Sequence, residues 1–130
     1  MREILFRGKR LDNSAWETGS LVILRMDCHD AQYYIADKMT GYHTPVDPST
    51  VGQYTGLLDK NGERIFEGDI AKVLQGKDKD IAYVGFENGA FMLYPKTGNI
   101  YERTLWEYWY NDWDVEVIGN VTDNPELLEK

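Results

Sequence analysis

The sequence has little cysteine and no long apolar run. Cys28 is the one cysteine among 130 residues, so no disulfide can form within the chain. Such a chain suits a reducing compartment, and we expect it in the cytoplasm of a host cell. No window approaches the roughly 20 apolar residues of a membrane span, and residues 1–7 lack the long apolar core of a signal peptide. These absences argue against an exported or membrane protein.

Basic charge is also scarce. Fourteen Lys and Arg stand against 22 Asp and Glu, which gives a formal net charge of −8. Proteins that bind DNA through its phosphates normally present a basic face. The dense basic residues here are confined to a short N-terminal group, which we expect to be solvated: Arg2, Arg7, Lys9 and Arg10. The charge therefore argues against direct nucleic-acid binding.

Apolar and aromatic residues, by contrast, are plentiful. Apolar residues make up 42% of the chain and include four Trp, nine Tyr and four Phe. A chain of this length and composition can bury a core without disulfides, metals or cofactors. No repeat or low-complexity linker is visible, so we expect residues 1–130 to form a single domain.

The apolar patterning predicts a mainly β protein: a small bent antiparallel sheet or an SH3-like barrel, with long loops and a short C-terminal helix. Residues 37–49 contain Gly41, Pro45 and Pro48 and are predicted to form a long loop, and residues 75–80 a turn. Asn124 and Pro125 are predicted to begin the helix. Strands are expected at residues 4–7, 19–24, 33–36, 70–74, 81–86, 90–94 and 115–121.

Turn residues punctuate residues 52–70. Asn61-Gly62 supplies the positive φ angles of a tight hairpin, between the apolar pairs at 57–58 and 65–66. A second turn follows at Glu67-Gly68-Asp69, where glycine allows a sharp corner before the next strand. We interpret Asp59, Asn61 and Glu63 as hairpin residues, because their spacing does not match a calcium loop.

Three blocks in the right order resemble the YopX family of phage and prophage proteins. The first block is residues 2–9, followed by Trp16 and Gly19-Ser20; the second is residues 52–70; the third is residues 116–121 and 123–128. The resemblance implies a phage- or prophage-encoded protein and brings no catalytic residues with it. The aromatic stretch 106–113 has no clear counterpart in the family.

That stretch is the main candidate for an interaction surface. Its spacing fits both a helix face and a strand face, and bulky aromatics most often serve the core. If exposed, they would form a protein interface or a base-stacking platform. The candidate surface combines them with two residues of the predicted 37–49 loop: Tyr42, His43, Trp106, Trp109, Tyr110 and Trp113.

Catalytic and metal-binding patterns are weak. Asp27, Cys28, His29 and Asp30 are adjacent, but neighbours on an extended chain point to opposite faces and no second cysteine completes a zinc set. His43 is a lone loop histidine without an identifiable partner. We therefore expect neither a metal nor catalytic residues.

Three functions remain open. The first is a non-catalytic binding or assembly module that docks on a host or phage protein, with possible homo-oligomers. The second is an acidic mimic of DNA that occupies a nucleic-acid-binding protein of the host. The third, ranked last, is a small enzyme that uses Glu67, Asp69 or His43 in a cleft.

Overall fold

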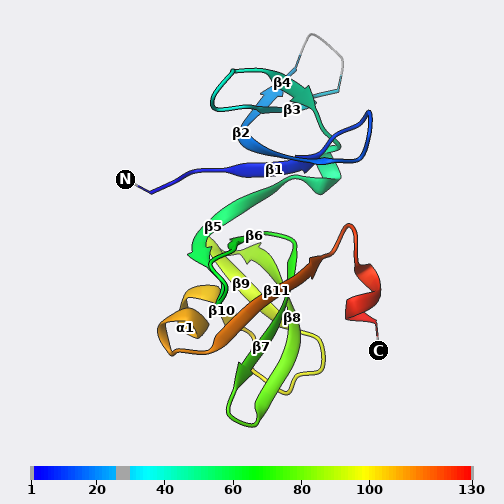
Figure 1. Ribbon diagram of the computed structural model, residues 1–130. Helices are drawn as coiled ribbons and strands as arrows, with labels where there is room; N and C mark the ends of the chain where they lie inside the picture. The colour runs from blue at the N-terminus through cyan, green and yellow to red at the C-terminus, as the bar shows by residue number, and fades with distance from the viewer. Residues whose placement is uncertain (1, 26–29, 130) are drawn as a thin grey trace. The chain divides into compact units, whose positions relative to one another are not determined.

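The computed structural model describes residues 2–25 and 30–129, and its strands are antiparallel (Figure 1). The chain divides into two compact units, with the boundary between residues 54 and 55. Strand β5 (Gly52–Leu58) begins in the first unit and ends in the second. The mainly β fold with bent antiparallel sheets is confirmed, and the described residues form open sheets and no closed barrel.

The N-terminal unit is a meander in which β1, β2, β3 and β4 pair in sequence and β1 also pairs with β5. Leu5, Ile35 and Val46 are buried in this unit. The strand predicted at residues 4–7 begins two residues later, and the one at 19–24 begins three residues earlier. The elements are β1 (Phe6–Lys9), β2 (Trp16–Leu24), β3 (Gln32–Ala36), β4 (His43–Pro45) and the 3-10 helix η1 (Pro48–Thr50).

The predicted long loop at residues 37–49 is wrong in its second half. Residues 43–45 form β4, which pairs with β3 through Tyr34–Pro45 and Ala36–His43. Asp47 then caps η1 by accepting a hydrogen bond from the Ser49 amide at 3.0 Å. Glycine and proline content predicts a turn or loop. It does not reveal that residues 43–45 can pair with β3.

The C-terminal unit holds a sheet in the order β10-β9-β8-β7-β11, and β6 extends the other sheet beyond β5. The predicted 75–80 turn is too long: Gln75 pairs with Asp78, so Gly76 and Lys77 alone connect the strands. The elements are β6 (Arg64–Phe66), β7 (Asp69–Gln75), β8 (Asp78–Glu87), β9 (Ala90–Pro95), β10 (Arg103–Thr104), α1 (Leu105–Tyr110), β11 (Asp114–Asn120) and the 3-10 helix η2 (Pro125–Leu128).

Residues with positive φ angles form two hairpin turns, and the positive φ predicted for both Asn61 and Gly62 occurs only at Gly62. Asn88 and Gly89 have φ of 53° and 82°, the conformation that joins β8 and β9 most tightly. At the earlier turn only Gly62 has positive φ, 81°, and its amide donates to the Asp59 carbonyl at 3.0 Å. The Gly68 corner is confirmed too, with the buried Asp69 carboxylate accepting from the Phe66 amide at 2.7 Å.

The core of this unit gathers residues from the sheet and from α1, which contacts β9, β10 and β11. Its buried members are Ile65, Ala71, Val73, Ala82, Val84, Leu93, Ile100, Leu105, Tyr108 and Val115. The predicted C-terminal helix is present as η2. Asn124 stands at its N-cap, but the Asn124 side chain accepts from the Asn120 amide instead of capping the helix. No helix within residues 2–25 and 30–129 is long and apolar enough to cross a membrane.

Candidate interaction groove

The aromatic stretch forms α1, which resolves the ambiguous sequence period in favour of a helix. Thr104 is its N-cap, and the threonine hydroxyl oxygen accepts from the Glu107 amide at 3.1 Å. The same hydroxyl donates to a Glu107 carboxylate oxygen at 3.1 Å, which holds the Glu107 side chain against the N-cap. A helix of six residues depends strongly on such a cap and on packing.

The helix ends in a left-handed residue that is not glycine. Asp112 has φ of 60°, and its amide donates to the Trp109 carbonyl at 3.3 Å. The Trp113 amide donates to the Tyr108 carbonyl at 3.1 Å, which completes a Schellman-type termination. Glycine is the usual residue at this position because a Cβ strains it.

The helix separates its aromatics between core and solvent. Tyr108 is buried and meets Trp113 edge to face, with ring centroids 5.0 Å apart. Trp106, Trp109 and Tyr110 are exposed by 54%, 49% and 64%. The expectation that the aromatics serve the core therefore holds for Tyr108 and is wrong for these three. Trp106 and Tyr110, one turn apart, stack at 4.9 Å.

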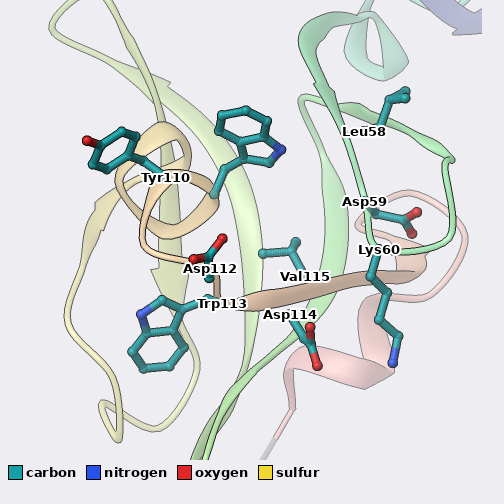
Figure 2. A pocket seen from close by; sticks show the side chains of 9 residues that line it. Leu58, Asp59, Lys60, Tyr110, Asp112, Trp113, Asp114 and Val115 are labelled. Carbon is teal, nitrogen blue, oxygen red and sulfur yellow. The ribbon is translucent and has the colours of Figure 1, made fainter.

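A groove of about 440 Å³ lies beside the exposed side of α1. Figure 2 shows Tyr110, Asp112 and Trp113 on one side of it, Leu58, Asp59 and Lys60 on the other, and Val115 between them. We call this hollow the aromatic groove. Its lining residues are Leu58, Asp59, Lys60, Trp109, Tyr110, Asp112, Trp113, Asp114 and Val115.

One wall of the aromatic groove is fixed by the Asp59 carboxylate. It is buried and accepts from the amides of Asn61 at 2.8 Å and Glu63 at 2.9 Å. Its other oxygen accepts from the Val117 amide at 3.0 Å, which ties the hairpin to β11. The interpretation of Asp59 as a hairpin residue is confirmed. With three main-chain donors already bound, this carboxylate serves the architecture of the groove.

The rim carries charges that have no such partners. Across the described residues, no hydrogen bond or ion pair reaches the carboxylates of Asp112 and Asp114, and both residues are exposed. Lys60 brings one opposing ammonium. Two carboxylates that line the same groove as Trp109 and Trp113 suit a cationic side chain, which aromatic faces attract and carboxylates bind by charge-assisted hydrogen bonds.

Sequence reasoning found the aromatics but missed the rest of the lining. Asp112 and Asp114 flank Trp113 in the sequence, and that alternation of acid and aromatic was the available signal. No sequence signal marked the other lining residues, because they reach the groove only through the pairing of distant segments: Leu58, Lys60 and Val115.

The other two predicted surface residues lie in the N-terminal unit. Tyr42 is 77% exposed. His43 is exposed on β4, with its Nδ1 2.8 Å from the Gly41 carbonyl oxygen and its ring edge-on to Tyr34. Trp106 lies on α1 but does not line the aromatic groove. The structure thus gathers Trp109, Tyr110 and Trp113 in one groove and places Tyr42 and His43 in the other unit.

The basic residue Arg10 pairs with acidic residues close to it in the sequence. Arg10 binds Asp12 through two nitrogens and Glu17 through one, and these hydrogen bonds raise the pKa of Arg10 above its usual range.

Asp27, Cys28 and His29 lie outside the described residues. In the part of the chain that is described, no group of three His, Cys, Asp or Glu side chains could hold a metal ion.

Comparison with known proteins identifies the fold and the family. The sequence model of the family described as YopX protein matches residues 5–129. Protein EF1440 from Enterococcus faecalis has a similar crystal structure, with a TM-score of 0.60 and 22% identity, over 99% of this chain and all of that one. Protein yopX from Bacillus subtilis gives the same score and identity over 96% and 98%. No curated protein matches the chain.

Proposed function

Because the chain belongs to the YopX family, we propose that it is a non-catalytic protein-binding module, and that the aromatic groove receives a basic side chain of its partner. The family resemblance implies a phage or prophage protein, so the partner would be a host or phage protein in the host cytoplasm. The observation that carries the proposal is that two carboxylates without a partner among the described residues, those of Asp112 and Asp114, line the same groove as exposed Trp109.

Chemistry supports a protein partner over other ligands. Trp, Tyr and Arg dominate the energetic centres of protein interfaces. A guanidinium group can stack on an indole and at the same time bind a carboxylate through two hydrogen bonds. Net charge points the same way, since a chain of −8 attracts basic surfaces and repels nucleic acid.

The backbone at Asp112 adds an independent argument. A left-handed residue other than glycine costs free energy, and such residues concentrate at functional sites. Here that cost places a carboxylate at the groove rim, where glycine would leave none.

A titration with N-acetylarginine methylamide, followed by two-dimensional NMR of the labelled chain, tests the charge preference. We expect the signals of Trp109, Asp112 and Trp113 to shift and the Trp109→Ala variant to lose at least tenfold in affinity. Phe86→Ala is the control, because Phe86 on β8 is an aromatic residue of similar exposure that lies outside the groove and, unlike Trp106, does not stack on Tyr110. An equal response to the norleucine analogue would contradict a cation-binding groove.

Capture from infected and uninfected host lysates tests the partner itself. We expect proteins that the unaltered chain and Phe86→Ala retain, and that Trp109→Ala and the Asp112→Asn/Asp114→Asn variant lose. Retention of nucleic-acid-binding proteins by Trp109→Ala, with loss at high salt, would instead favour the DNA-mimic hypothesis.

A further inference from the structure

Three lysines meet on one face of the C-terminal sheet. Lys72 on β7 pairs with Ile81 on β8, and the Lys96 amide donates to the Ile81 carbonyl at 2.7 Å. Directly paired residues share a face of a sheet, so Lys72, Ile81 and Lys96 form one cross-strand row. Lys79 precedes Ile81 by two residues on β8 and therefore points to the same side.

These lysines line a second hollow, of about 290 Å³, which we call the lysine hollow. It is lined by Lys72, Lys79, Asp80, Ile81, Lys96, Thr97 and Asn99. The chain as a whole has 14 basic against 22 acidic residues. Three ammonium groups among seven lining residues are thus a local reversal of the overall charge.

The ammonium groups are available to a ligand. Within the described residues, no hydrogen bond or ion pair is made by the side chains of Lys72 and Lys79. Glu116 is the neighbour of Lys72 on β11, but its carboxylate accepts from the Asn61 side chain at 3.2 Å. Lys96 donates one proton to the Leu127 carbonyl at 3.2 Å and keeps two more.

The one carboxylate in the lining is already satisfied. Asp80 is 6% exposed, and its oxygens accept from the amides of Ile81 at 2.8 Å and Asn99 at 3.1 Å. They also accept from the Thr97 amide and, at 2.7 Å, from the Thr97 hydroxyl. Asp80 thereby holds residues 96–99 in place, and its negative charge is offset by these donors.

We propose that the lysine hollow binds a phosphate-bearing anion. Three ammonium groups supply the charge, and ammonium is a common phosphate-binding group. The side-chain amide of Asn99 makes no hydrogen bond within the described chain and adds a neutral donor at the same rim. The ligand is a compact group with several anionic oxygens, either inorganic phosphate or pyrophosphate or the phosphates of a nucleotide.

The test is an NMR titration of the full chain at constant ionic strength with phosphate, pyrophosphate and ATP, with chloride as the reference. We expect shifts at residues 72, 79, 81 and 96–99. The Lys72→Gln/Lys79→Gln variant should bind at least tenfold more weakly. Tighter binding of ATP than of pyrophosphate would identify a nucleotide, and equal or weaker binding an inorganic anion.

Lys77→Gln is the matched control. Lys77 is an exposed lysine in the turn between the same two strands, but it lies outside the hollow. We expect this variant to keep its affinity within about twofold. Equal losses in Lys77→Gln and the double variant, or no response to any phosphate compound, would overturn the proposal. Lys79→Gln alone replaces the double variant if thermal unfolding shows the latter to be misfolded.

Discussion

The aromatic groove and the lysine hollow lie in the same unit and share one structural feature. Each contains a buried aspartate, Asp59 or Asp80, whose carboxylate is satisfied by main-chain amides and fixes a loop. The rims differ in sign. Asp112 and Asp114 edge the first hollow, and lysines edge the second.

This comparison separates two roles for charge. A buried carboxylate that accepts several amide hydrogen bonds stabilises the fold and has little capacity left for a ligand. An exposed charge without a partner adds little to stability and remains free to bind. Substitutions at the two kinds of position should therefore affect different measurements.

The largest expected effect is that of Asp59→Ala. Its three amide donors lose their acceptor, and we expect the free energy of unfolding to fall by about 3 kcal/mol. Denaturant unfolding measures the change. Because Asp59 joins the hairpin to β11 beside the aromatic groove, binding of the arginine probe should weaken while phosphate binding at the lysine hollow persists. If a folded Asp59→Ala variant lost both arginine binding and phosphate binding, the independence of the two hollows would be contradicted.

Asp80→Asn should weaken phosphate binding at the lysine hollow and leave arginine binding at the aromatic groove unchanged. We expect the free energy of unfolding to fall by about 2 kcal/mol at pH 7. Burial opposes ionisation of Asp80, but hydrogen bonds from Thr97, Ile81 and Asn99 outweigh it and lower its pKa. The stabilisation is present above the unfolded pKa of about 3.9 and is lost as the pH falls through the lower folded pKa. Urea unfolding of both proteins from pH 7 to pH 2.5 should show their difference narrowing below about pH 4. A constant difference would contradict the role assigned to the charge.

Thr104→Ala should have a smaller effect, confined to the aromatic groove. Removing the N-cap of α1 costs about 1 kcal/mol because the Glu107 amide loses its acceptor. Amide hydrogen exchange should show faster opening of α1, while β7 and β8 stay protected. Thr104→Ser is the control, since it keeps the capping oxygen. An unchanged exchange rate in α1 would mean that packing alone holds the helix.

The smallest effect, and the one of opposite sign, is expected from Asp112→Gly. Glycine relieves the strain of the left-handed position and should raise stability by about 0.5 kcal/mol. The same change removes a rim carboxylate, so arginine binding should weaken. Thermal unfolding and the arginine titration measure the two effects on one variant. Asp112→Asn, which tolerates the same backbone, separates charge from conformation. If Asp112→Gly is more stable and binds the arginine probe as tightly as the unaltered chain, Asp112 is not part of the binding site.

Local signals in the sequence account for most of the strands and for two tight turns. Gly62 and Gly68 could be identified as turn residues because positive φ is a property of single residues. Strand β4 escaped prediction because it exists only through pairing with β3. Its glycine- and proline-containing surroundings pointed to a loop.

The sites were less accessible to prediction than the fold. The aromatics of α1 could be identified as candidates, but their separation into buried Tyr108 and exposed Trp109 depends on which helix face meets the sheet. The lysine hollow depends on strand register. Lys72 and Lys96 are neighbours across Ile81 only because β7, β8 and the end of β9 pair in that alignment. Sequence alone does not specify that alignment.

The distribution of tryptophan gives the two hollows different optical properties. Trp109 and Trp113 line the aromatic groove, Trp106 lies on the same helix, and no tryptophan lines the lysine hollow. A ligand entering the groove should therefore change the intrinsic fluorescence of the chain, whereas an anion held by the lysines should leave it nearly constant. An unlabelled sample can thus report in a cuvette whether a ligand has entered the aromatic groove.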